Sequence, residues 1–84
     1  MKSVYCVADG ADLFWYVSDS SANAKQTHVN TQYESAQIKL DESDLADMKV
    51  EKVPAHHWVT FDGVSKPASQ WAGEKNGFLG TTAT

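Results

Sequence analysis

The sequence predicts a small α+β domain with a mostly antiparallel sheet of about four to five strands and one or two helices packed on one face. Residues 13–17, Leu-Phe-Trp-Tyr-Val, form an unbroken run of large apolar side chains, which indicates a strand buried on both faces. A second β-rich run, 4–8, is joined to it by a short connection containing Gly10, which is typical of a hairpin. Two later segments, 48–53 and 57–61, also have strand character.

Capping and turn residues predict the remaining elements. Asp19, Ser20 or Ser21 can each cap a helix over 20–33 that lies on the sheet. Pro67 suits the first turn of a second helix, which Asn76 and Gly77 end. The predicted single domain comprises an N-terminal hairpin over 1–17, a helix over 20–33, an acidic segment and strand over 34–53, a strand over 57–61, a helix over 66–76, a short strand at 78–79 and a frayed tail over 80–84.

The segment 35–40 is compatible with two structures. It alternates imperfectly, and it suits either an edge strand or an extension of the preceding helix. We favour the strand, because residues 41–44 then form the capped opening of a short helical turn through Met48. The core residues expected from these elements are Trp15, Val17, Ile38, Leu40, Leu45, Val59, Phe61, Trp71 and Leu79.

Length and charge narrow the possible functions. The 84 residues suffice for one modest core, and the formal net charge is −4. All seven basic residues are lysines, and the absence of arginine together with the negative balance argues against direct nucleic-acid binding. With no signal-peptide pattern and no long apolar stretch, we expect a soluble cytoplasmic protein that does not bind membranes, as a monomer or homodimer.

No pattern in the sequence predicts catalysis or metal binding. His56 and His57 are adjacent, and neighbours on a strand point to opposite faces, so we do not expect them to share a metal. His28 belongs to the first helix, and Cys6, the single cysteine, is expected to be an apolar core residue. No serine lies in a nucleophile-elbow motif. We therefore expect no enzyme activity and no cofactor.

Acidic residues concentrate between positions 34 and 51. This stretch has two interpretations: a solvated face that keeps a small protein soluble, or an electronegative surface that attracts a basic partner. In the second interpretation, Tyr33 and His57 are candidate aromatic anchors for tighter contact. The carboxylates of the candidate binding surface are Glu34, Asp41, Glu42, Asp44, Asp47 and Glu51.

Two segments resemble small phage and prophage proteins. Residues 14–25, Phe-Trp-Tyr-Val-Ser-Asp-Ser-Ser-Ala-Asn-Ala-Lys, are similar to an aromatic strand that runs into an alanine-rich helix in those proteins. Residues 65–73, with 77–79, resemble their terminal Trp-Ala helix followed by Gly-Phe-Leu. Comparable proteins often carry cysteines near the positions of Ala68 and Gly80, and neither is a cysteine here.

The resemblance implies a protein that acts in the cytoplasm of a bacterial host. Many acidic phage proteins of this size, anti-CRISPR and other anti-defence inhibitors among them, bind a bacterial protein or ribonucleoprotein complex and compete with nucleic acid as a DNA mimic. We expect this function first. The alternatives are a phage structural or accessory domain that self-associates through sheet edges, and a regulator of transcription that acts by protein contact.

Overall fold

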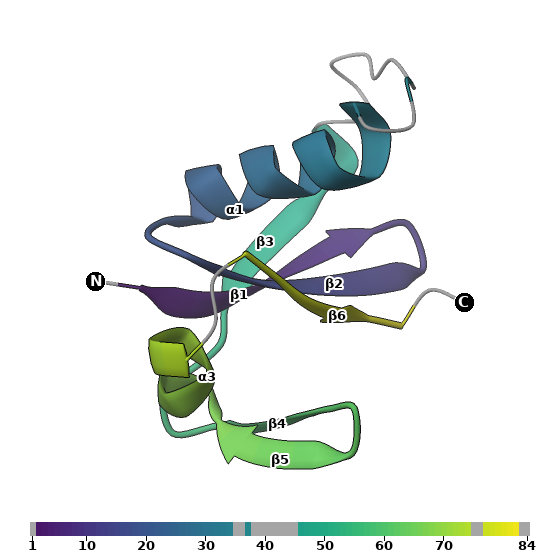
Figure 1. Ribbon diagram of the computed structural model, residues 1–84. Coiled ribbons are helices and arrows are strands. Elements are labelled where there is room, and N and C mark those ends of the chain that lie inside the picture. The colour runs from purple at the N-terminus through teal and green to yellow at the C-terminus, as the bar shows by residue number, and fades with distance from the viewer. Residues whose placement is uncertain (1, 35–36, 38–45, 75–76, 83–84) are drawn as a thin grey trace.

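The computed structural model describes residues 2–34, 37, 46–74 and 77–82. A four-stranded antiparallel sheet in the order β3-β1-β2-β6, a two-stranded β4-β5 hairpin and two α-helices make up this part of the chain, which confirms the α+β class (Figure 1). The elements in chain order are β1 (Ser3–Asp9), β2 (Asp12–Ser18), α1 (Ser21–Val29), the π-helical segment η1 (Asn30–Glu34), β3 (Lys49–Lys52), β4 (Trp58–Phe61), β5 (Val64–Pro67), α3 (Ala68–Glu74) and β6 (Gly77–Thr81).

The central strands β1 and β2 form the expected N-terminal hairpin. Their register runs from Ser3 opposite Ser18 to Asp9 opposite Asp12. Gly10 takes the first turn position with a φ of 64°, a left-handed conformation that glycine adopts without the steric cost of a Cβ atom. The aromatic run of β2 therefore lies in the middle of the sheet, with β1 on one side and β6 on the other.

The two helices cover opposite faces of the sheet rather than the same one (Figure 1). On one face, Val4 and Val17 pack against Trp71 of α3. On the other, Phe14 and Tyr16 form a cluster that α1 and η1 cover. The reason is the aromatic run itself: five consecutive large apolar residues on a strand must alternate between two faces, so both faces need a cover.

The first helix begins where the capping residues predict. Ser20 is its N-cap, and its Oγ accepts a hydrogen bond from the backbone N–H of Asn23 at 3.1 Å. The α-helical part ends at Val29, and the chain continues as the π-helical segment η1 to Glu34. Together they span nearly the whole predicted helix. The helix places Ala24 and His28 in the interior.

Residues 64–67 form strand β5, where the sequence suggested the approach to a helix. Asp62 and Gly63 have φ values of 54° and 78°, which make a tight two-residue connection from β4 to β5. Asp-Gly between two β-forming runs is the strongest short-range hairpin signal, and it outweighed the helix-starting tendency of Pro67. Pro67 instead ends β5, and α3 begins one residue later.

Aromatic contacts hold the β4–β5 hairpin against the sheet. The Phe61 ring lies edge-on between two tryptophans, with centroid distances of 5.7 Å to Trp15 and 5.2 Å to Trp71. The Trp71 indole N–H also donates to the carbonyl oxygen of Val59 at 3.0 Å. The Phe61 ring packs directly against the backbone of Gly80 in β6, because glycine has no side chain to occupy that space.

The C-terminal residues of the described chain pair with the sheet. The expectation of a frayed tail over 80–84 is therefore wrong for residues 80–82. β6 extends to Thr81, and the hydroxyl of Thr81 donates to the carbonyl oxygen of Leu13 at 2.8 Å. The backbone N–H of Thr82 donates to the same oxygen, and the Leu13 N–H donates to the Thr82 hydroxyl. Threonine hydroxyls therefore continue the strand pairing beyond β6, while residues 83 and 84 lie outside the described residues.

The core agrees only partly with the expected set. Val17 and Trp71 are buried, and four other expected residues pack half-buried against the core. The fully buried side chains also include Tyr16 and His28, which the sequence did not single out. Apart from Gln37, which lies in a turn, the predicted strand over 35–40 and the expected core residues Ile38, Leu40 and Leu45 fall outside the described residues.

Adding a methyl group at Gly80 is expected to destabilise the domain. A Cβ atom there lies 2.5 Å from the nearest ring carbon of Phe61, so the ring must move away from Trp15 and Trp71. Overpacking of this kind costs about 1–3 kcal/mol. We predict that Gly80→Ala lowers the free energy of unfolding by that amount in urea titrations. Gly73→Ala, in α3 with open space around the added methyl, is the control and should be neutral or stabilising by up to about 1 kcal/mol.

Candidate protein-interaction surfaces

Three carboxylates of the acidic stretch belong to the described chain, and all three are exposed. Glu34 ends η1 and Asp47 stands immediately before Met48. Met48 is buried in the cluster against which Tyr33 packs, so Glu34 and Asp47 flank the same part of the core. Neither forms an ion pair with another described residue. Asp41, Glu42 and Asp44 lie outside the described residues.

Glu51 is separated from that acidic pair by its place on the sheet. It lies on β3 opposite Cys6, which is on the same face as Val4 and α3. Lys49 and Lys52 stand on either side of it on the same strand. Burial raises the pKa of the Cys6 thiol and the negative charge of Glu51 raises it further, so the thiol stays protonated near neutral pH.

Tyr33 is tied into the protein and is not the exposed aromatic that the sequence suggested. Its hydroxyl donates to the Asp9 carboxylate at the end of β1. The same carboxylate oxygen lies 2.9 Å from Nε2 of His28. His28 and Tyr33 are five residues apart, which is the hydrogen-bond spacing of a π-helix. The π-helical segment thus lets two side chains reach one carboxylate.

His28 links this carboxylate to the core of the sheet. The ring is fully buried, and its Nδ1 lies 2.7 Å from the Tyr16 hydroxyl. In the neutral imidazole, Nε2–H donates to Asp9, which can only accept, and Nδ1 accepts from Tyr16. Burial raises the pKa of Tyr16 to about 12, so its hydroxyl keeps the proton that it donates. A Tyr–His–Asp chain of this kind could relay a proton, but the buried ring offers no access to a substrate, and its evident role is to fasten α1 and η1 to the β1–β2 hairpin.

His56 and His57 lie in the turn before β4, not on the strand. Both are exposed, and their ring centroids are 5.9 Å apart, so the expectation that they point to opposite faces is wrong. Across the described residues, no group of three His, Cys, Asp or Glu side chains is placed to hold a metal ion.

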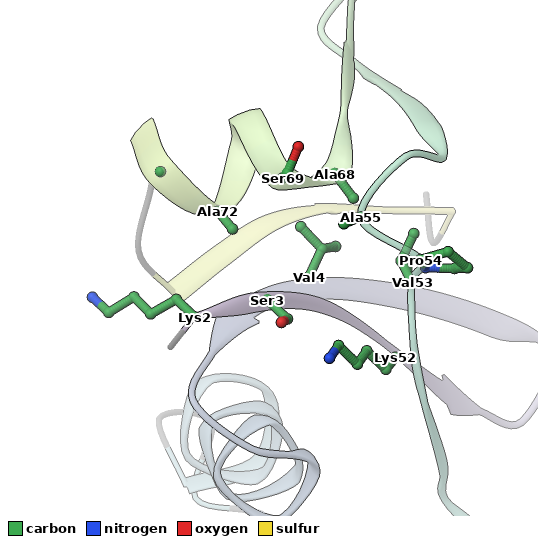
Figure 2. Close-up of a pocket in the computed structure, with 11 residues that line it drawn as sticks. Lys2, Ser3, Val4, Lys52, Val53, Pro54, Ala55, Ala68, Ser69 and Ala72 are labelled. Atoms are coloured by element: carbon green, nitrogen blue, oxygen red, sulfur yellow. The ribbon is translucent and has the colours of Figure 1, made fainter.

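A cavity of about 530 Å³ lies between α3 and the start of β1 (Figure 2). Figure 2 shows Val4 at its floor, with Ala68 and Ala72 of α3 facing it, while the Ser3 and Lys52 side chains lie on the other side of β1. The residues around it are mostly small and apolar, and they include no carboxylate or imidazole that could activate a serine hydroxyl. The groups of its lining that could act as acid or base are the lysines Lys2 and Lys52.

Three large apolar side chains of the described chain are exposed, and they do not share one face. Trp58 is 68% exposed, Val64 46% and Phe78 44%. Two hollows, of about 340 and 250 Å³, open on either side of Phe61. Trp58 borders the first hollow, and Val64 and Phe78 border the second. The register places Trp58 on the opposite face of the hairpin from Phe61 and Val64, and the Phe78 ring lies 5.5 Å from that of Tyr16 on the α1 side of the sheet.

Comparison with protein-family models, with curated proteins and with solved structures finds no match to this chain. Among the described helices, none has the length and apolar character needed to cross a membrane. The chemistry of the surfaces described above is therefore the basis for a functional proposal.

The Asp9 carboxylate is expected to make the free energy of unfolding depend on pH in the acidic range. Burial acts to raise its pKa, but hydrogen bonds from Tyr33 and His28 outweigh burial, so the pKa is lowered from 3.8. A carboxylate with a lowered folded-state pKa stabilises the fold above its unfolded value, and this contribution is lost as pH falls through the lower folded pKa. We predict that Asp9→Asn lowers the free energy of unfolding at neutral pH by about 1–3 kcal/mol and flattens its decline below about pH 4.

Asp12→Asn is the matched control, because Asp12 faces Asp9 across the turn, is exposed and loses the same charge. It should leave both the stability and its acid dependence close to those of the parent in urea titrations repeated from neutral pH to pH 3. Equal effects of the two substitutions would show that net charge, and not the bonds to His28 and Tyr33, governs acid stability.

Proposed function

We propose that this protein is a non-enzymatic anti-defence inhibitor, encoded by a phage or prophage, that binds a bacterial nucleic-acid-binding complex in the host cytoplasm and competes with nucleic acid. The observation that carries the proposal is the acidic stretch. Its described members Glu34, Asp47 and Glu51 are exposed, and none of them is neutralised by an ion pair with another described residue. Free carboxylates on a protein of net charge −4 favour contact with a basic surface.

Competition with nucleic acid follows from the chemistry of such a partner. A protein that binds a phosphate backbone presents lysines and arginines at a high positive potential. Carboxylates on a folded surface can occupy these cations in place of phosphates. Exposed charges act mainly on the association rate and are screened by salt, so the inhibitor should bind more weakly as ionic strength rises.

Glu34 and Asp47 are the best-defined members of the acidic surface. They flank one buried cluster, which includes Met48 and Tyr33, and that cluster fixes the positions of η1 and the residues before β3. Glu51 stands apart between two lysines and contributes less net charge. The electrostatic contact is therefore assigned first to Glu34 and Asp47, together with Asp41, Glu42 and Asp44 between them in the sequence.

Self-association through a sheet edge is a second candidate function. Of the two edge strands of the four-stranded sheet, β3 and β6, the second is better suited to it. β3 carries three charged residues among its four, which protects an edge from pairing, whereas β6 has none. A register shift opposite Trp15 and Tyr16 interrupts β6, however, and such irregularities oppose edge-to-edge pairing. Sedimentation velocity distinguishes the two candidates, because self-association gives a concentration-dependent dimer or larger species.

Charge reversal tests the inhibitor function. Purified CRISPR effector complexes of several types, each loaded with its guide RNA, would be mixed with the protein, and binding of a labelled target DNA would be measured. We predict that the parent protein blocks DNA binding by at least one type. The double variant Glu34→Lys/Asp47→Lys should need at least about tenfold more protein for the same block, because it turns attraction to the partner into repulsion.

The control is Asp12→Lys/Asp19→Lys, which makes the same change in net charge at two exposed positions outside the acidic stretch. It should inhibit like the parent protein. Equal inhibition by both double variants would mean that the acidic stretch is only a solvated face. Failure to block any complex, in the assay and in infected cells that rely on these systems, would contradict the anti-defence function itself.

A further inference from the structure

Four strands of the described chain have an outer edge that no other described strand pairs with: β3 and β6 in the sheet, and β4 and β5 in the hairpin. Such edges usually carry charged residues, a proline or a bulge, which oppose pairing with another chain. β3 is mostly charged, β5 contains Lys66 and Pro67, and a register shift interrupts β6. β4, with the sequence Trp-Val-Thr-Phe, has none of these features. It is therefore the least protected edge of the four.

The register of the hairpin decides which main-chain groups of β4 are used in pairing with β5. Phe61 and Val64 flank the two-residue turn, and the pair next to such a turn exchanges both of its hydrogen bonds. Hydrogen-bonded pairs then recur at every second residue of an antiparallel ladder. In agreement with this alternation, the N–H of Ala68 donates to the carbonyl oxygen of His57 at 2.7 Å, four residues along the strand from Phe61.

Trp58 and Thr60 are the residues of β4 that lie between the hydrogen-bonded pairs. Their N–H and C=O groups therefore point away from β5, toward the outer edge. In the described part of the chain, no hydrogen bond is made to these four groups. They present donors and acceptors at the spacing of a strand, which is the arrangement that a further strand recognises.

The hollow of about 340 Å³ lies along this same edge. All four residues of β4 line it, and no residue of β5 does. Successive residues of a strand point to opposite faces, so a hollow that all four line runs beside the main chain and not over one face. Trp15, Thr81 and Thr82 form its other side. The outer edge of β4 is therefore open, but recessed beside the end of β6.

The recess and its lining determine what can occupy this edge. A second copy of the chain presents the same recessed edge, so the residues around Thr81 and Thr82 of each copy would hold the two β4 strands apart. A single extended segment is narrow enough to enter. No charged residue lines the hollow, and a charged side chain placed there would lose its water without gaining a partner. The rings of Trp15, Trp58 and Phe61 favour an apolar side chain.

We propose that the outer edge of β4 binds an extended, uncharged segment of a partner protein, which adds to the hairpin as a third strand. The main chain of the segment exchanges hydrogen bonds with Trp58 and Thr60, and one of its apolar side chains enters the hollow beside Phe61. Strand addition takes its affinity from main-chain bonds and its specificity from pockets for alternate side chains. The inference goes beyond the proposed function, because it depends on no carboxylate of the acidic stretch.

Backbone methylation of a bound peptide tests the main-chain pairing. A displayed library of random twelve-residue peptides would be sorted for binding to the parent protein, and an enriched peptide would be synthesised. We expect enrichment of short runs of uncharged β-branched and aromatic residues without proline. A series with one N-methyl group at each position of the run should alternate, because only every second N–H faces β4. Affinity should fall at least about tenfold at those positions and change little at the positions between them.

Proline substitution tests the same edge from the side of the protein. Thr60→Pro removes an outward N–H of β4 and keeps the bonds to β5, since an edge strand tolerates proline where its N–H faces outward. It should bind the peptide at least about tenfold more weakly. Ser65→Pro is the matched control, because Ser65 pairs with Thr60, its N–H points outward from β5, and either substitution removes the same contact between their hydroxyls. It should bind like the parent.

Urea titrations verify that both variants are folded, and the N-methyl series needs only the parent protein. Equal affinity of Thr60→Pro and Ser65→Pro, a methylation series without alternation, enrichment of charged runs, or no enrichment at all would overturn the inference. So would a concentration-dependent dimer of the parent that Thr60→Pro dissociates in sedimentation velocity, because a second copy would then occupy the edge. None of these readouts depends on inhibition of DNA binding.

Discussion

Burial of β2 on both faces is the constraint on which the rest of the structure depends. Phe14 and Tyr16 point to one face, and Trp15 and Val17 to the other. Each fully buried side chain of this size contributes about 1.5–3 kcal/mol, so a small domain cannot leave either face open to water. The two covers have different characters. The α1 side is fastened by the bonds between His28, Tyr16 and Asp9, and the α3 side by aromatic contacts.

The two sides of the sheet therefore differ in what they expose to solvent. On the α1 side, the polar side chains bond to one another within the protein, because the Asp9 carboxylate accepts hydrogen bonds from both His28 and Tyr33. On the α3 side, Val59 and Phe61 of the β4–β5 hairpin pack against the core together with Trp71 of α3, and the alternate residues of β4 face solvent. An alternating strand laid over a small sheet exposes every second side chain, and Trp58 is one of these. The exposure of Trp58 is thus a consequence of how the second face is closed.

Local signals predicted the parts of the fold that depend on a few neighbouring residues. The Leu13–Val17 run, the turn at Gly10 and the Ser20 cap all act within a turn or a strand, and each element begins close to where they indicate. The same reasoning missed β5, because the Asp-Gly turn and Pro67 gave competing local signals. His28 was also missed, because its burial depends on partners 12 and 19 residues away in the sequence.

The exposed features of the surface were predictable to different extents. Charge is a property of composition, so the acidic stretch was visible from the sequence, although three of its carboxylates lie outside the described residues. The exposure of Trp58 was not, since alternation within 57–61 does not say which face a hairpin turns toward the sheet. That choice is made by Phe61, which fits over Gly80 because β6 has no side chain there.

Native-state amide hydrogen exchange tests most directly whether β2 is the rigid centre and the β4–β5 hairpin a separately closing cover. The amides of Phe14 and Tyr16 should exchange only through global unfolding, with the slowest rates in the domain. The amides of Val59 and Phe61 should exchange faster, through local release of the hairpin at low denaturant concentrations. Exchange of the β2 amides as fast as those of β4 would contradict the account.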